Sequence, residues 1–235
     1  MCYNIVMNIS KWLKDNSETE FKDFSVRLVK TRYDILGIRL PKLRKYAKDL
    51  VNRFGADALS RLSDDTFEEI MLQGFVVAYL KTDFEVKKIL IDNYLRKCDN
   101  WSLIDSFASS FKLKDKDYQN GWKMLNEYKN NQMLLQEKPY IERFVLCLSM
   151  NLYLNDQYID EILKYSEILK DRKYAVKMAN SWLLATAAIK YFDKVIDVII
   201  KMDEETIRYF KGKIRDSYRI DEDKKERIKQ IWPKK

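Results

Sequence analysis

The sequence predicts an all-α protein, built as a single α-solenoid of HEAT-like helical repeats that spans residues 1–235. Only 5 Gly and 3 Pro occur in the 235 residues, whereas a sheet protein of this length needs many more turn-forming residues. Apolar residues recur at helical spacing along nearly the whole chain. Segments that are apolar on most faces also alternate with segments charged on one side, as the inner and outer helices of a solenoid do.

About a dozen helices are predicted from this periodicity. Their breaks are expected, in chain order, near Ser17, Gly37 to Pro41, Gly55, Ser63-Asp64, Lys81 to Asp83, Asp99, Lys114 to Asp117, Lys138-Pro139, Asn155-Asp156, Asp171, Met202-Asp203 and Asp221. Several breaks offer a side chain that can cap the next helix, namely Asp64, Thr82 or Asp83, Asp99 and Asp203. No linker or low-complexity segment divides the chain, which is why one domain is expected.

Three segments predict inner and outer helices. Tyr140 to Leu154 and Tyr174 to Phe192 are apolar almost all round, so both are expected to be buried on most faces. Asp156 to Lys170 carries its charges on one side, as an outer helix does. From Trp101 to Arg143 is 42 residues and from Arg143 to Trp182 is 39, near the period of HEAT-type repeats.

The charge of the chain favours a polyanionic partner. The net charge is +8 and the pI is about 9.1. Residues Phe21 to Arg53 contain ten Lys or Arg against three Asp or Glu, whereas Phe54 to Leu80 contain one against five. Lys201 to Lys235 are basic again, with twelve against eight. For any single lysine, a solvated surface position remains the more common role.

Several function classes are disfavoured by composition. The chain has no histidine, so chemistry must use carboxylates, lysines, hydroxyls or thiols. The three cysteines, Cys2, Cys98 and Cys147, are far apart and odd in number, which argues against a disulfide framework or a zinc site. We expect reduced thiols and a cytoplasmic protein. No apolar window is long enough to span a membrane.

The most informative motif is Trp101-Ser-Leu-Ile-Asp105, which follows Cys98-Asp99-Asn100 at the start of a predicted helix. Positions four apart lie on the same helix face, so the indole and the carboxylate are expected to point the same way. Taken alone, such a Trp is more often a packing residue and such an Asp more often a surface or capping acid. Together they suggest a carboxylate that faces a cationic centre.

Several motifs together resemble the AlkD family of helical-repeat DNA glycosylases, the DNA alkylation repair enzymes. The resemblance runs from about Phe24 to Lys190. It rests on Leu36-Gly37-Ile38-Arg39-Leu40-Pro41-Lys42-Leu43-Arg44, Glu69-x-x-x-Gln73, Trp101-x-x-x-Asp105, Tyr140-Ile-Glu-Arg143 and Lys177-Met-Ala-Asn-Ser-Trp182. Each motif is weak alone, whereas the ordered set is fairly specific.

The resemblance implies a right-handed solenoid, curved, with a basic concave face that binds double-stranded DNA as a monomer. It also implies base excision of cationic N3- or N7-alkylated purines by a monofunctional glycosylase, a hydrolase of N-glycosyl bonds. Asp105 would be the catalytic carboxylate, Trp101 and Trp182 would flank the damaged nucleotide, and Arg143 would contact a phosphate. Further phosphate contacts are expected among Arg39, Lys42, Arg44, Lys45, Lys173 and Lys177.

The chemistry of these residues agrees with that implication. An alkylated purine is a cationic leaving group, so the N-glycosyl bond breaks toward an oxocarbenium-like deoxyribose. A nearby carboxylate stabilises that charge and orients water, and aromatic faces also favour positive charge. A site made of one Asp and two Trp requires no metal and no cofactor, and we expect none.

Two departures from the family pattern leave alternatives open. Active relatives often have an arginine one turn after the second tryptophan, where this chain has Ala185, and an aromatic residue where it has Leu28. The first alternative is therefore a DNA-structure-binding protein of the same fold without catalysis. A weaker one is a helical-repeat scaffold for protein interactions, since a fold alone does not fix function.

Overall fold

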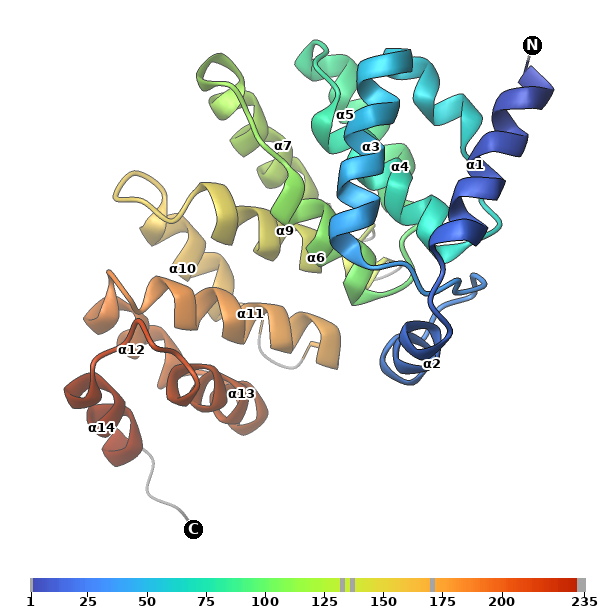
Figure 1. Ribbon diagram of the computed structural model, residues 1–235. Helices are drawn as coiled ribbons and strands as arrows, with labels where there is room; N and C mark the ends of the chain where they lie inside the picture. The colour runs from blue at the N-terminus through green and yellow to red at the C-terminus, as the bar shows by residue number, and fades with distance from the viewer. Residues whose placement is uncertain (1, 132–133, 136–137, 170–171, 232–235) are drawn as a thin grey trace. The chain divides into compact units, whose positions relative to one another are not determined.

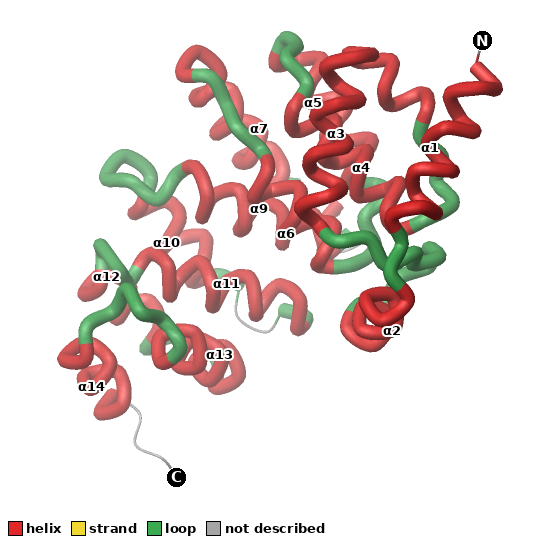
Figure 2. Tube along the Cα trace, viewed as in Figure 1, coloured by secondary structure: helices red, strands yellow, loops and turns green. Residues whose placement is uncertain are grey.

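The protein folds entirely into helices in the part of the chain that its structure, a computed structural model, describes: residues 2–131, 134–135, 138–169 and 172–231. Side chains are described for all of these except residues 2–8, 139 and 231. Within these ranges there is no strand, and Asp34 and Thr66 form only an isolated bridge (Figure 2). The all-α prediction is confirmed.

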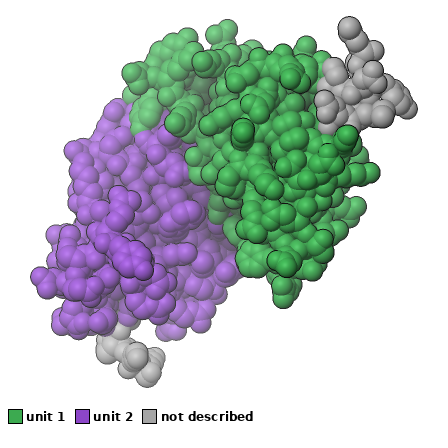
Figure 3. Space-filling view, in the orientation of Figure 1, with its two compact units in different colours: residues 1–130 green, residues 131–235 purple. Residues whose placement is uncertain are grey.

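The chain divides into two compact units, residues 1–130 and residues 131–235 (Figure 3). We describe each unit by itself. The single domain over residues 1–235, the handedness and the curvature remain predictions.

Unit 1 is built around one central helix, α4 (Phe67–Tyr79), in which every residue from Phe67 to Ala78 is buried (Figure 1). Helix α4 packs against α3, α5 and α6. Its sequence is apolar on most faces, and this is the pattern of a helix surrounded by others. The remaining elements are α1 (Cys2–Asn16), α2 (Thr19–Leu28), α3 (Leu40–Phe54), η1 (Gly55–Arg61), α5 (Phe84–Leu95), α6 (Trp101–Ser110), η2 (Asp115–Asp117) and α7 (Tyr118–Asn130).

Unit 2 has two layers of helices. The inner helices α9 (Pro139–Leu152), α11 (Tyr174–Ala187) and α13 (Glu204–Arg215) pack in series, α9 on α11 and α11 on α13. The outer helices are α10 (Ile159–Glu167), α12 (Phe192–Ile199) and α14 (Glu222–Ile231), and α10 packs on α12. Helix pairs that follow one another in this way form an α-solenoid of helical repeats, as the sequence predicts.

Four ion pairs join the outer segments of successive repeats, and each spans 34 residues. Lys190 binds Asp156, Lys194 binds Asp160, Lys201 binds Glu167 and Arg227 binds Asp193. The constant separation gives a repeat length of 34 in unit 2, shorter than the spacing of 39 from Arg143 to Trp182. The two lengths differ because Arg143 lies in the second turn of α9, whereas Trp182 lies in the third turn of α11.

Most helix ends fall at the predicted breaks, with corrections at the caps. The hydroxyl of Thr66, not Asp64, caps α4, and the amide of Asn100, not Asp99, caps α6. Asp203 caps α13 as predicted. Tyr174 to Phe192 contains the end of one helix and the start of the next, since α11 stops at Ala187 and α12 begins at Phe192. The break predicted at Asp171 lies outside the described residues.

Candidate active site

Helix α6 presents Trp101 and Asp105 on one partly exposed stripe. The side-chain oxygen of Asn100 accepts hydrogen bonds from the N–H groups of Ser102 at 2.9 Å and Leu103 at 3.2 Å, which fixes where the helix begins. Trp101, Ser102, Asp105 and Ser109 are the residues of α6 that are not buried. Because these positions follow one side of a helix, the indole and the carboxylate lie on the same face, as the sequence predicts.

A hydrogen-bonded network fixes the loop that leads into Trp101. The carboxylate of Asp99 accepts bonds from the Thr31 hydroxyl at 2.9 Å and from the Arg32 N–H at 2.7 Å. The phenol of Tyr33 donates to the carbonyl of Lys97 at 2.8 Å. Two loops distant in sequence are thereby tied together immediately before the exposed face of α6 begins.

The Glu69–Gln73 pair does not face an open surface, because both side chains are buried, and its main partner is Ser63 in the loop before α4. Glu69 accepts hydrogen bonds from the backbone N–H of Ser63 at 3.2 Å and from the hydroxyl of Ser63 at 2.9 Å. Gln73 donates to the Ser63 carbonyl at 2.8 Å and accepts from Lys97 at 2.9 Å. Glu69 therefore holds the loop before α4, and Gln73 connects that loop to Lys97 in the segment that precedes α6.

Glu68 is a positioning residue that the sequence analysis missed. Its buried carboxylate accepts hydrogen bonds from three consecutive backbone N–H groups, those of Leu36 at 2.9 Å, Gly37 at 2.7 Å and Ile38 at 3.2 Å. Such a cluster of charge-assisted bonds fixes the loop before α3. The sequence offered little signal for this role, because Glu68 stands beside Glu69 and shortly after Asp64 and Asp65.

Gly37 is required in that loop for two reasons. Its φ of 87° lies in the left-handed region that favours glycine. A Cβ at this position would also lie 2.5 Å from the backbone nitrogen of Lys22. The Leu36-Gly37-Ile38 motif therefore has a structural role in holding α2 close to the entry of α3.

Aromatic packing holds α6 against its neighbours. The ring of Tyr94 lies edge-on to Phe107, with ring centroids 4.7 Å apart. The Tyr94 phenol donates to the carbonyl of Leu103 at 3.2 Å. Gly74 in α4 makes room for that ring, since a Cβ there would lie 2.5 Å from the Tyr94 ring. The helix that carries Asp105 is thus fixed from the side opposite its exposed stripe.

In unit 2, Trp182 lies on the accessible side of α11. Its exposed fraction is 39%, although the rest of the helix is largely apolar and buried. The ammonium of Lys213 lies 5.9 Å from the centre of one of its rings. Sequence periodicity alone favours a core position for Trp182, whereas the resemblance to the AlkD family implies that its side chain is accessible.

Arg143 is buried, with an exposed fraction of 6%, and donates a hydrogen bond to the backbone carbonyl of Ala175. The adjacent carboxylate of Glu142 interacts instead with Arg172 at 3.4 Å and with the Tyr165 phenol at 3.4 Å. Burial raises the pKa of Glu142, while the charge of Arg172 acts in the opposite direction. Arg143 therefore connects α9 to the first turn of α11.

Three of the expected phosphate contacts are already bonded to carboxylates. Arg39 and Lys42 both bind Glu18, at 2.8 Å and 3.1 Å. Lys177 is buried and binds Asp203 at 2.9 Å and Glu205 at 3.0 Å. These ion pairs must be broken or shared before the cations can bind phosphate.

The other three expected contacts form no ion pair with a carboxylate among the described residues. The guanidinium of Arg44 donates to the hydroxyl of Ser109 at 2.9 Å and lies over the Phe75 ring. Lys45 and Lys173 are exposed. Arg44 is the residue of this group that lies beside the stripe of Asp105.

The predicted catalytic residues fall into one pair in each unit. Trp101 and Asp105 share one face of α6 in unit 1, and Arg143 and Trp182 lie on the packed helices α9 and α11 in unit 2. That the two pairs meet around one nucleotide stays a prediction.

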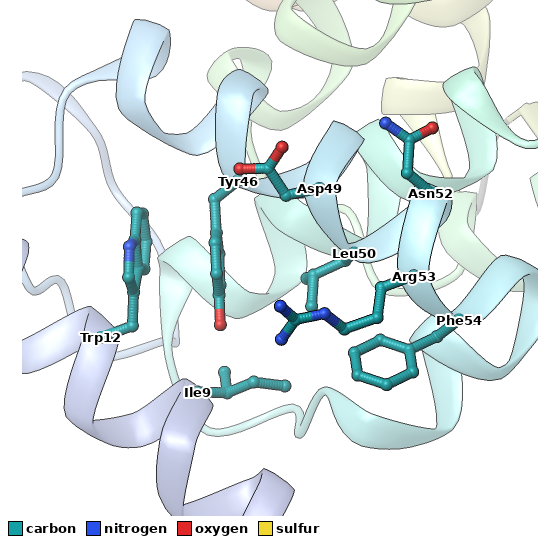
Figure 4. A pocket seen from close by; sticks show the side chains of 8 residues that line it. All are labelled: Ile9, Trp12, Tyr46, Asp49, Leu50, Asn52, Arg53 and Phe54. Carbon is teal, nitrogen blue, oxygen red and sulfur yellow. The ribbon is translucent and has the colours of Figure 1, made fainter.

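A second feature of unit 1 is a pocket of about 650 Å³ between α1 and α3 (Figure 4). The rings of Trp12 and Tyr46 stack at one side of it, 3.8 Å apart and nearly parallel. Asp49 and Arg53 bring one charge of each sign to its lining, and it contains none of the predicted catalytic residues.

Among the described residues, no group of Cys, Asp and Glu is arranged to hold a metal ion. No helix in those residues has the length and apolarity needed to cross a membrane.

Comparison with known proteins gives one match. The sequence model of a family described as DNA alkylation repair enzyme matches residues 9–210. No curated protein and no solved structure matches the chain. The family match covers most of the chain and includes α6, α9 and α11 with their candidate residues, so the protein belongs to the family of DNA alkylation repair enzymes.

Proposed function

We propose that the protein is a DNA glycosylase that excises cationic N3- or N7-alkylated purines from double-stranded DNA. The observation that carries the proposal is the shared, partly exposed face of Trp101 and Asp105 on α6, in a chain of the DNA alkylation repair family. The net charge of +8 supports a polyanionic substrate.

Asp105 supplies the negative charge in the proposed mechanism. As the N-glycosyl bond breaks, its electron pair leaves with the base, which becomes a neutral alkylated purine. Positive charge then develops on C1′ and the ring oxygen of the deoxyribose, and the carboxylate stabilises that charge. The same carboxylate orients the water that attacks C1′ and accepts its proton.

The two tryptophans act through their ring faces. An aromatic face attracts positive charge, which in the transition state is spread over the sugar. Trp101 lies one turn before Asp105 on the same stripe, and Trp182 is 39% exposed on α11. We infer that both flank the damaged nucleotide once DNA is bound. The leaving group is already cationic, so the reaction needs no histidine to protonate it.

A second candidate function is DNA binding without excision. Two observations favour it: Arg143 is bonded to the Ala175 carbonyl rather than presented at an open surface, and Ala185 is buried. Active relatives often have an arginine where this chain has Ala185. A site that lacks that guanidinium, and in which the guanidinium of Arg143 is engaged with Ala175, has less positive charge with which to bind the phosphates near the lesion.

The experiment is base release from a duplex methylated at purine nitrogens, with wild type and Asp105→Asn compared under single-turnover conditions. Removing the charge is expected to lower the rate roughly 100-fold. Asp197→Asn, the same change at an exposed position of α12, is the matched control and should act as wild type.

The outcomes separate the two functions. Equal release by wild type and Asp105→Asn would remove Asp105 from the mechanism. Salt-sensitive duplex binding by wild type without any release would favour the binding protein over the glycosylase.

A further inference from the structure

Unit 1 contains a groove of about 820 Å³ whose lining is strongly basic. It is formed by one side of α3 from Arg44 onward, the end of α4, the start of α5, and the end of α6 with the segment that follows. Its cationic side chains are Arg44, Lys48, Lys81, Lys87, Lys112 and Lys114. Asp117 is the one acid among its lining residues.

These cations have little compensation within the protein. Lys48, Lys81, Lys112 and Lys114 are exposed and, among the described residues, form no ion pair. Elsewhere on the surface, cations such as Lys190 and Lys194 are paired with acids. A groove that gathers six cations against a single lining acid produces a local positive potential, which attracts polyanions.

Lys87 lies in the lining of this groove and is largely buried, with an exposed fraction of 8%. Its ammonium lies 5.4 Å from the centre of the Phe111 ring. Burial lowers the pKa of Lys87; the charge of Asp117 opposes this shift and that of Lys114 adds to it. A buried cation that forms no ion pair with a carboxylate is unfavourable in the free protein. An anion that enters the groove neutralises the charge of Lys87, and this neutralisation contributes favourably to the free energy of binding.

Arg44 adds a second incompletely bonded cation. Its Nε is buried and finds no hydrogen-bond partner within the described part of the chain, while the other end of its guanidinium donates to Ser109. The hydroxyls of Ser109 and Ser110 also line the groove, and both donate to the carbonyl of Ser106, at 3.1 Å and 2.8 Å. The donors left to an incoming phosphate are therefore the guanidinium and ammonium groups, which proteins commonly use to contact the DNA backbone.

The groove lies beside the stripe of the proposed catalytic carboxylate. Ser109 follows Asp105 by one helical turn on the same side of α6, a rise of about 6 Å. An anion bound at Arg44, beside Ser109, is therefore on the order of one or two nucleotides from a sugar placed at Asp105, since one strand of DNA rises about 3.4 Å per nucleotide.

We propose that this groove binds the sugar–phosphate backbone of the duplex next to the lesion, with Lys112 and Lys114 as its outer contacts and Lys87 and Arg44 as its inner ones. The inference deepens the proposed function and rests on DNA being the substrate. It moves the main backbone contact away from Arg39, Lys42 and Lys177, whose charges are already paired.

The test measures binding of the full chain to an unmethylated duplex as a function of salt, by fluorescence anisotropy. The groove variant is Lys112→Ala with Lys114→Ala, two exposed positions where truncation leaves the core intact. The matched control is Lys190→Ala with Lys194→Ala, which removes the same charge from exposed positions that are paired with acids. Equal melting temperatures verify that all forms are folded.

The groove variant is expected to bind about tenfold or more weakly, and its slope of log Kd against log salt should fall by about two, one for each lost phosphate contact. The control should change neither quantity. Lys87→Met should weaken binding in the same direction, whereas Lys87→Arg, which keeps the charge, should weaken it less. If the groove variant and the control weaken binding equally, or if the slope of log Kd against log salt does not change, the proposal that the groove binds the DNA backbone is wrong.

Base release by the same proteins separates this inference from the proposed function. If wild type and the groove variant release base at the same rate and bind DNA equally well, the proposal that the groove binds the DNA backbone is wrong, whereas the proposed glycosylase activity is supported. Groove-dependent binding with no release by wild type would support the groove and overturn the glycosylase.

Discussion

The guanidinium of Arg44 on α3 donates a 2.9 Å hydrogen bond to the hydroxyl of Ser109, one turn beyond Asp105 on α6. This bond joins two helices that both pack on α4. It also places a cation of the basic groove beside the stripe that carries the proposed catalytic carboxylate. Substrate binding and chemistry would then share one rigid part of unit 1, supported from beneath by a fully buried helix.

We predict that Glu68→Gln destabilises the protein by about 2–3 kcal/mol, because three buried N–H groups lose a charged acceptor. Urea unfolding followed by circular dichroism measures the change. Glu85→Gln, an exposed acid in the first turn of α5, is the control and should stay within about 0.5 kcal/mol of wild type. Equal effects of the two substitutions would show that the Glu68 bonds do not stabilise the loop.

A pair of glycine substitutions should change stability in opposite directions. Gly37→Ala introduces a Cβ at a φ of 87° and 2.5 Å from a backbone nitrogen, so it should destabilise by about 2 kcal/mol or more. Gly212→Ala lies within helix α13 with no atom within 4 Å of the new Cβ, so it should stabilise by about 0.5–1 kcal/mol. Thermal unfolding of both variants gives the two signs. A Gly37→Ala protein as stable as wild type would contradict the backbone argument.

The local sequence pattern predicted those features that depend on residues close in sequence, such as which side chains share a helix face. Trp101 and Asp105 could be placed on one face because their spacing of four matches the helical period. Caps were harder to assign, because Asp64 and Thr66, or Asp99 and Asn100, are near neighbours with similar capping ability. Only the fold decides which side chain reaches the first free N–H groups.

Long-range contacts could not be predicted in the same way. Lys42 reads as a free cation in a basic segment, yet it binds Glu18 in the structure, 24 residues away. The groove draws its residues from four helices, and nothing in the local sequence of Lys87 or Lys112 connects them. Glu68 stands in an acidic segment without any sign of the loop that it binds, since that loop precedes it by 30 residues at Ile38.

The ion pair between Lys177 and Asp203 should make stability depend on acid pH. Burial alone would raise the pKa of Asp203, but hydrogen bonds from Lys177 and Thr206 outweigh it and hold the pKa at about 2, below the ordinary 3.8. A lowered folded-state pKa contributes stability above the ordinary value, and this is lost as the pH falls from about 4 to about 2. The contribution is at most about 2 kcal/mol, because Asp203 retains some contact with solvent.

Asp203→Asn tests this contribution with little disturbance, since Asn is an equally good helix cap. Urea unfolding at several pH values should show wild type more stable than the variant above pH 4, with the difference shrinking toward pH 2. A constant difference across this range would mean that the charge of Asp203 is not its source.

Trp101 and Trp122 should separate function from stability. Trp101 is partly exposed at the start of α6, whereas Trp122 on α7 is buried with Lys129 over its ring at 4.0 Å. Trp122→Ala should therefore destabilise by about 3–5 kcal/mol, and any activity it loses should follow the unfolded fraction. Trp101→Ala should unfold nearly as wild type but release alkylated base about tenfold more slowly, because an aromatic face beside the developing sugar cation is lost. Single-turnover base release and urea unfolding of both variants measure the two effects, and a Trp101→Ala protein with normal release would exclude its indole from the reaction.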